Sequence, residues 1–125
     1  MEKVQTLQDG KLIIEIEELQ NLIKITWLGE CTSKNPSEFL NPILNEQYKL
    51  CLQKNKQMVL NFKQTKYMNS AGIIPIIRIL KIIRDERGSV QVRFNISEKW
   101  QTVLIGELKI FETEDNRVQI LGTKD

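Results

Sequence analysis

Residues 68–75, with the sequence MNSAGIIP, join an apolar, strand-like segment to the most apolar helix-like segment of the chain. Ser70 stands at this junction, where the first turn of a helix leaves backbone N–H groups without intrahelical partners. The positive end of the helix macrodipole makes such a position favourable for negative charge. The junction therefore suits a phosphate, either attached covalently to Ser70 or bound beside it.

The segments on both sides of the junction have clear secondary-structure patterns. Residues 58–62 (MVLNF) form a short apolar run with the length and composition of an interior strand. A helix is predicted from Ala71 to about Arg87, with Gly88 as its C-cap. Pro75 is tolerated only near the first turn, so either the regular helix begins late or its opening is distorted.

Further elements follow from hydrophobic periodicity, capping residues and turn signals. Strands are predicted over residues 11–17 and 22–28, paired as a hairpin, and then over residues 89–96 and 117–121. A helix capped by Asn35 fades near residues 53–56. Another helix, opened by Ser97, has on its inner face Trp100, Val103, Leu104 and Leu108. The order β-β-α-β-α-β-α-β implies right-handed crossovers and a mixed, mostly parallel sheet. We expect one α/β sandwich domain over residues 1–125, with residues 1–10 and 122–125 flexible.

The composition is that of a globular domain. Of the 125 residues, 41% are hydrophobic and 27% charged, and the net charge of +2 is too small to indicate direct nucleic-acid binding. The longest apolar run, residues 73–83, is interrupted by Pro75, Arg78 and Lys81, so no membrane insertion is expected. The polar N-terminus lacks the apolar segment of a signal peptide, which favours a cytoplasmic protein.

The chain contains no histidine. This excludes Ser-His-Asp and Cys-His nucleophile activation, together with the commonest zinc sites. Cys31 and Cys51 form neither a CxxC motif nor a disulfide framework, so reduced thiols are expected. We therefore expect a protein that is not an enzyme and that uses no metal or cofactor.

A helical wheel of the segment after the junction separates two faces. The expected core face consists of Ile73, Ile76, Ile77, Leu80 and Ile83. The other face is a stripe that consists of Ser70, Ile74, Arg78, Lys81, Ile82 and Asp85. Isoleucines beside charged residues are typical of a partner-binding site, unless neighbouring elements cover them. The sequence favours neither alternative.

Ser70 also has a purely structural explanation. Its hydroxyl can cap the helix, with Asn69 as a competing cap, and on local chemistry alone the cap is the better explanation. The same geometry would let the fold tolerate phosphorylation, because a charge of about −2 would meet a positive helix end. The lysines and arginines of residues 63–87 are better explained as a solvated face than as a nucleic-acid site, because only Tyr67 supplies an aromatic ring nearby.

The segment from Met58 to about Phe111 resembles the STAS domain (sulphate transporter and anti-sigma factor antagonist), in particular the free-standing bacterial anti-sigma factor antagonists. The strand VLNF (59–62) leads through a linker to NSAGI (69–73), where the family has Asp-Ser-[Ser/Thr/Ala]-Gly-[Leu/Ile]. Gly88, the strand that follows it and the helix with Val103 and Leu104 look like the family's next elements. The first half of the chain agrees in pattern only.

This resemblance implies a partner-switching regulator of signal transduction and transcription. In that family the serine at the position of Ser70 is phosphorylated by a serine kinase with a histidine-kinase-like ATP-binding fold, which doubles as an anti-sigma factor. A metal-dependent serine phosphatase removes the phosphate. The unphosphorylated protein binds the kinase, and phosphorylation ends the binding. The switch loop would consist of Asn69, Ser70, Ala71 and Gly72, and the partner-binding face of Ile74, Arg78, Lys81 and Ile82.

Two features depart from the family pattern. Asn69 replaces the usual Asp, which keeps a capping oxygen but removes the carboxylate. The sequence also stops soon after Leu121, without the family's usual last helix. A second copy or a partner would then cover the surface that this helix covers, and we expect a monomer or a weak dimer.

Two alternatives keep the same fold. In the first, the protein is an interaction scaffold in which Ser70 only caps the helix. In the second, the helix N-terminus senses a small anion or a nucleotide.

Overall fold

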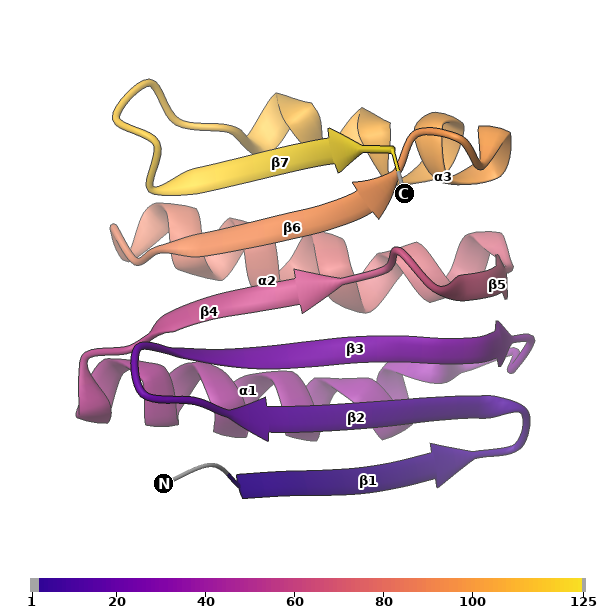
Figure 1. Cartoon of the computed structure of the whole chain (residues 1–125), viewed down its shortest axis with the longest axis horizontal. Helices are drawn as coiled ribbons and strands as arrows, with labels where there is room; N and C mark the ends of the chain where they lie inside the picture. Colours follow the sequence, from indigo (N-terminus) through magenta and orange to yellow (C-terminus); the bar gives the residue numbers. More distant parts are fainter. Residues whose placement is uncertain (1–2, 125) are drawn as a thin grey trace.

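Helices cover one face of a seven-stranded sheet (Figure 1). The computed structural model describes residues 3–124, so Met1, Glu2 and Asp125, which fall in the segments predicted to be flexible, lie outside the described residues. The elements are, in chain order, β1 (Lys3–Asp9), β2 (Leu12–Glu18), β3 (Leu22–Cys31), α1 (Pro36–Lys54), β4 (Gln57–Asn61), β5 (Thr65–Met68), the 3₁₀ helix η1 (Ser70–Ile73), α2 (Ile74–Asp85), β6 (Val90–Asn95), α3 (Lys99–Leu104), the 3₁₀ helix η2 (Gly106–Phe111) and β7 (Val118–Thr123).

The sheet is mixed and mostly parallel, as predicted. Its strand order is β1-β2-β3-β4-β6-β7, and β5 pairs with β3. β1, β2 and β3 form an antiparallel meander, whereas the pairs β3–β4, β3–β5, β4–β6 and β6–β7 are parallel. The C-terminal ends of β5 and β6 therefore lie at one end of the sheet, together with the starts of α2 and α3 (Figure 1). In open α/β sheets this end commonly carries the functional site.

β1 is a regular strand, although the sequence predicted the first ten residues to be flexible. It pairs antiparallel with β2 along its whole length. Gly10, with φ 62°, stands first in the two-residue connection, as a type II′ hairpin turn requires. The hydrophobic pattern did not predict this strand because β1 is an edge strand open to solvent. Of its residues, only Leu7 is half-buried and the others are exposed. At the other end of the chain, Gly122 and Thr123 belong to β7 rather than to a flexible tail.

β5 was also unexpected, because its segment was predicted to be part of a linker. Its end residues Thr65 and Met68 are buried, whereas Lys66 and Tyr67 between them are exposed, so the strand shows no alternation. Parallel pairing with the last residues of β3 holds it in place. The hydroxyl of Thr65 also donates a hydrogen bond of 2.8 Å to the carbonyl oxygen of Trp27.

A bulge between β3 and β5, in which Lys66 of β5 is the extra residue, sets the position of β5. The parallel register shifts between Gly29 and Glu30, and Gly29 has φ 77°. The N–H of Glu30 donates to the carbonyl oxygen of Lys11 at 3.1 Å. Beyond the bulge, Cys31 lies opposite Met68. The bulge therefore determines where the chain leaves the sheet for the Ser70 junction.

The core lies between the sheet and the helices. Alternate residues of the strands point into it, for example Leu12, Ile14 and Ile16 of β2. Trp27, which is fully buried, packs on Phe62 with 4.4 Å between the ring centroids. Because both rings are fully buried, truncation of either one would leave a cavity in the core.

The third helix turns a different face to the core than predicted. Val103 is 56% exposed, whereas Gln101 and Ile105 are fully buried. Gln101 accepts a hydrogen bond from the N–H of Asn95 at 2.8 Å and donates one to the carbonyl oxygen of Thr65 at 3.1 Å. The prediction for Val103 was wrong because this buried amide, rather than apolar spacing, orients the short helix. The other predicted inner residues do pack on the core: Trp100, Leu104 and Leu108.

Glu18 ties the end of β2 to the end of α1. Its carboxylate accepts hydrogen bonds from Lys54 at 2.7 Å and from Lys56 at 2.9 Å. These two ammonium groups lower the pKa of Glu18 from 4.5 to about 2. A carboxyl group with a lowered pKa in the folded state stabilises the fold above its unfolded pKa.

We expect that the stability provided by Glu18 is present above pH 4.5 and is lost as the pH falls toward 2. Urea unfolding midpoints of the wild type and of Glu18→Gln should differ at neutral pH and converge as the pH falls through this range. Glu114→Gln, at an exposed loop position, is the matched control. A constant difference between wild type and Glu18→Gln across this range would contradict the assignment.

Candidate functional site

The junction after β5 begins with a 3₁₀ turn. Asn69 is extended, with φ −74° and ψ 170°, and residues Ser70–Ile73 form η1. The α-helix starts only at Ile74, so that Pro75 falls in its first turn, where a missing N–H costs no intrahelical hydrogen bond. Both outcomes that Pro75 allowed are therefore observed: the regular helix starts late, and its opening is a 3₁₀ turn.

Asn69, and not Ser70, caps this turn. Its side-chain oxygen accepts a hydrogen bond from the N–H of Gly72 at 3.0 Å. Its side-chain nitrogen donates to the carbonyl oxygen of Ser33 at 2.8 Å, and its backbone N–H donates to the carbonyl oxygen of Cys31 at 3.0 Å. Asn69 thus fastens the junction to β3 and to the loop before α1. An aspartate could form the first of these bonds but could not donate the second.

We expect Asn69→Asp to lower the free energy of unfolding by about 1 kcal/mol, because the carbonyl group of Ser33 loses its hydrogen-bond donor. Asn69→Ala should lower it by about 2 kcal/mol, because the cap on the N–H of Gly72 is lost as well. Thermal unfolding measures both. Asn21→Asp, at an exposed turn, controls for the added charge. If Asn69→Asp is as stable as the wild type, the bond to Ser33 contributes nothing.

Ser70 is exposed and its hydroxyl is not used by the fold. Within residues 3–124, no hydrogen bond of its side chain occurs, and the capping role belongs to its neighbour. The nearby backbone donors are largely occupied: the N–H of Gly72 is bonded to Asn69, the N–H of Ile74 to the carbonyl oxygen of Ala71, and Pro75 has none. The junction therefore offers few donors for a bound anion but leaves the Ser70 hydroxyl accessible.

Gly72 allows the turn to lie directly on the sheet. A Cβ at this position would stand 2.5 Å from Cγ of Met68 and 3.1 Å from Sγ of Cys31. Gly72 is buried, and Ala71 beside it is half-buried. The glycine of the NSAG motif is thus explained by close packing, which holds Ser70 at the surface.

Only part of the predicted partner-binding face is accessible at the surface. Ile74 is 58% exposed and Lys81 is exposed. Ile82 is half-buried and packs against the core, and the guanidinium of half-buried Arg78 donates a hydrogen bond to the side chain of Asn45 on α1. Ile74 and Lys81 are accessible to a partner, whereas Arg78 and Ile82 help to join α2 to its neighbours.

An apolar groove of about 440 Å³ lies between the start of α2 and η2. It is lined by Ile73, Ile77, Leu104 and the residues of η2. Ile73 and Ile77 were predicted to be core residues, and they are half-buried because they form one wall of this groove, whereas Ile76, Leu80 and Ile83 are fully buried. Since Ile73 is the last residue of η1, the groove begins within one turn of Ser70.

Sequence patterns did not reveal this groove or Ile110, a lining residue that is 80% exposed. The residues of η2 follow a 3₁₀ helix, so they lack the 3.6-residue period by which an amphipathic helix is recognised. The only available signal was the apolar content of the segment LKIF at residues 108–111.

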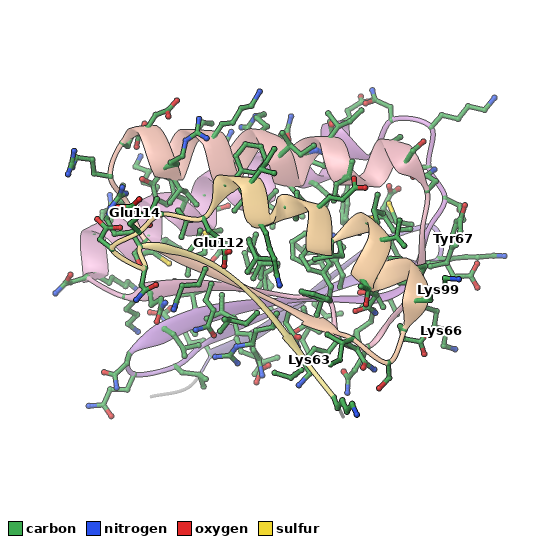
Figure 2. The ribbon with its side chains drawn as sticks, turned by 90° about the horizontal axis from the view of Figure 1, so that it is seen from above. Lys63, Lys66, Tyr67, Lys99, Glu112 and Glu114 are labelled. Carbon is green, nitrogen blue, oxygen red and sulfur yellow. The ribbon has the colours of Figure 1, made fainter. Side chains whose placement is uncertain are left out.

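Lysines lie at the same end of the molecule as the junction. Figure 2 shows Lys66, Tyr67 and Lys99 at one end of the molecule and Glu112 and Glu114 toward the other. The basic residues of positions 63–87 do not gather into one patch, since Arg84 lies over the ring of Phe111 at 5.4 Å and Arg78 contacts α1.

Cys31 and Cys51 are buried free thiols. Burial raises the pKa of Cys31, and it raises that of Cys51 to about 11, so neither is an activated nucleophile. In the described part of the chain, no cluster of three or more Cys, Asp or Glu side chains is arranged to hold a metal ion. No helix among residues 3–124 is long and apolar enough to cross a membrane.

Comparison with known proteins supports the fold. No protein-family model and no curated protein sequence matches the chain. Among solved structures, SiaC of Pseudomonas aeruginosa superposes with a TM-score of 0.68 at 12% identity, over 97% of this chain and 99% of that chain. A chain in the crystal structure of the diguanylate cyclase SiaD in complex with its activator SiaC, from the same organism, gives a TM-score of 0.64 at 13% identity, over 95% and 99%. The STAS-like α/β architecture expected from the sequence is thereby confirmed.

Proposed function

We propose that this chain is a signalling regulator that binds a partner protein through the surface around Ser70, and that phosphorylation of Ser70 ends this binding. The observation that carries the proposal is the exposed, unused hydroxyl of Ser70 in η1, whose last residue lines the apolar groove. A modifiable group and an apolar docking surface are thus one helical turn apart.

The docking surface combines apolar and basic chemistry. Ile110 lines the groove and is 80% exposed, and Ile74, next to the lining residue Ile73, is 58% exposed. Lys66 and Lys99 stand at the same end of the molecule (Figure 2). An apolar side chain of the partner can fill the groove while acidic residues around it meet the lysines, which is the usual arrangement of an apolar interface centre with a polar rim.

Phosphorylation would change this surface sharply. A phosphoserine carries about −2 charge and three strongly hydrated acceptor oxygens. Beside an apolar groove, this charge would have to be desolvated when the partner docks, and it would repel acidic residues of the rim. The fold itself would tolerate the group, because Ser70 is exposed and Asn69 supplies the cap.

The structural neighbours support regulation by direct binding. SiaC is described as the activator of the diguanylate cyclase SiaD and shares this architecture. The resemblance to anti-sigma factor antagonists supports the finer proposal that a kinase with a histidine-kinase-like ATP-binding fold modifies Ser70 and that a metal-dependent phosphatase restores it. The protein then acts in the cytoplasm without a catalytic group or cofactor of its own.

The experiment is phosphorylation of the purified chain by a candidate kinase of this class with ATP, followed by intact-mass measurement. One phosphate should be added to the wild type and to Ser89→Ala, a matched exposed serine, but not to Ser70→Ala. Phosphate on another residue with Ser70 unmodified would overturn the proposed switch.

A further inference from the structure

The two edge strands of the sheet, β7 and β1, differ in how far their outward main-chain groups are hydrogen-bonded. Along the first half of β7 (Val118–Thr123), the segment before the strand is hydrogen-bonded to the outward main-chain groups. The N–H of Val118 donates to the hydroxyl of Thr113 at 3.1 Å, the N–H of Thr113 donates to the carbonyl oxygen of Val118 at 3.2 Å, and the N–H of Ile120 donates to the carboxylate of Glu112 at 3.0 Å. The first half of this edge is therefore closed to a further strand.

β1, at the opposite edge, is open. Within residues 3–124 it pairs with β2 alone, and six of its seven residues are exposed. It contains no proline and no register shift, which are two of the usual means of blocking an edge. Its charged residues are confined to its two ends, at Lys3 and Asp9.

Hairpin geometry determines which main-chain groups of β1 point outward. A two-residue connection makes the flanking pair, Asp9 and Leu12, a hydrogen-bonded pair. Hydrogen-bonded and non-hydrogen-bonded pairs alternate along an antiparallel ladder. The N–H and C=O groups of Val4, Thr6 and Gln8 therefore point away from β2 and have no strand to pair with in the described part of the chain.

The sequence of β1 is complementary to itself when it is read antiparallel about Thr6. Thr6 then lies opposite Thr6, and Val4 opposite Gln8, so every outward main-chain group meets another one. In the same register Lys3 lies opposite Asp9 at both ends of the strand pair. Residues 3 and 9 are on the same face of the sheet, so each lysine can form an ion pair with an aspartate.

We propose that β1 pairs antiparallel with β1 of a second copy, on a twofold axis through Thr6, and joins the two sheets into one continuous sheet. The arrangement is isologous, as the closed symmetry of most homodimers requires. A groove of about 450 Å³ between β1 and α1, lined by residues that include Gln5, Ile16 and Leu50, would lie on each side of the axis and receive side chains of the other copy.

This inference is independent of the proposed function. The β1 edge and the η2 groove are at opposite edges of the sheet (Figure 1), because β1 and β7 end the strand order and η2 packs beside β7. A dimer formed through β1 would leave both Ser70 surfaces free.

The first test is sedimentation equilibrium of the full chain over a range of concentrations, comparing the wild type with Thr6→Pro and Thr6→Val. Proline removes an outward N–H and leaves the pairing with β2 intact, whereas valine keeps the N–H. Thr6→Pro removes two symmetry-related hydrogen bonds, so the dimer dissociation constant should rise by about 30-fold, while Thr6→Val should dimerise like the wild type. The melting temperature of each monomer reports that the fold is kept.

Charge reversal and cross-linking test the register. Asp9→Lys should weaken the dimer, and Lys3→Asp combined with Asp9→Lys should restore it. Thr6→Cys should give cross-linked dimers with a short thiol-reactive linker, because the native cysteines are buried, whereas Thr123→Cys on β7 should not. A wild type that stays monomeric at all concentrations, a dimer indifferent to Thr6→Pro, or equal cross-linking through Thr6→Cys and Thr123→Cys would overturn the proposal.

Discussion

Replacing Gly29 with alanine is expected to lower the free energy of unfolding by roughly 3 kcal/mol, or the melting temperature by about 10 °C. Two causes add. Gly29 has φ 77°, a conformation that costs an alanine about 1 kcal/mol. A Cβ there would also overlap the carbonyl oxygen of Lys11, which already accepts a hydrogen bond from Glu30. Because both groups belong to the backbone, neither can move without disturbing the bulge.

Gly10→Ala is the matched control. Gly10 has a similar φ of 62°, but an added Cβ would meet nothing within 4 Å. Its loss of stability should therefore reflect the backbone conformation alone, at about 1 kcal/mol. Equal losses for Gly10→Ala and Gly29→Ala, measured by urea unfolding, would mean that the bulge relaxes and does not fix the position of β5.

Ser70→Asp is expected to weaken binding of the cognate partner by about 100-fold, with the melting temperature unchanged. The aspartate places a negative charge on η1 beside the apolar groove, where docking would desolvate it. Since a carboxylate carries less charge than a phosphate, the loss on phosphorylation should be larger still. Ser70→Ala should bind like the wild type, because the Ser70 hydroxyl has no bond to lose.

Ser89→Asp provides the control for Ser70→Asp, because Ser89 is exposed and immediately precedes β6, away from the junction. Calorimetric titration with the partner measures all three variants. Equal binding by Ser70→Asp and the wild type would favour the scaffold alternative. Weaker binding accompanied by a lower melting temperature would assign the effect to a damaged junction rather than to charge.

The fold could be predicted from sequence wherever burial imposes a period. β2, β3 and β6 alternate between the covered and open faces of the sheet, and α2 repeats its buried residues at helical spacing. β1 and β5 were missed because tertiary pairing, and not a buried face, makes them strands. The prediction of the buried face of α3 was wrong because the buried side-chain amide of Gln101, which donates a hydrogen bond to Thr65 far away in the sequence, outweighs local apolar spacing.

The candidate site could be predicted in part. The NSAG motif located the junction, and the wheel placed Ile74 outside the core face without deciding whether it is covered; the structure leaves it 58% exposed. The sequence did not decide whether Asn69 or Ser70 is the cap, because the choice depends on the Ser33 carbonyl, which β3 brings to the junction from 36 residues away. The role of Ser70 as a phosphorylation site remains a prediction.

The three hydrogen bonds of Asn69 have a consequence for the energetics of recognition. They anchor the junction to β3 and to the loop before α1, so its hydrogen-bonded amides, those of Asn69 and Gly72, should exchange with solvent as slowly as those of the sheet rather than like those of a surface loop. A site that is already ordered loses little conformational entropy when it is bound. Association at this surface is then limited by orientation and charge during the encounter, and not by a folding step of the loop.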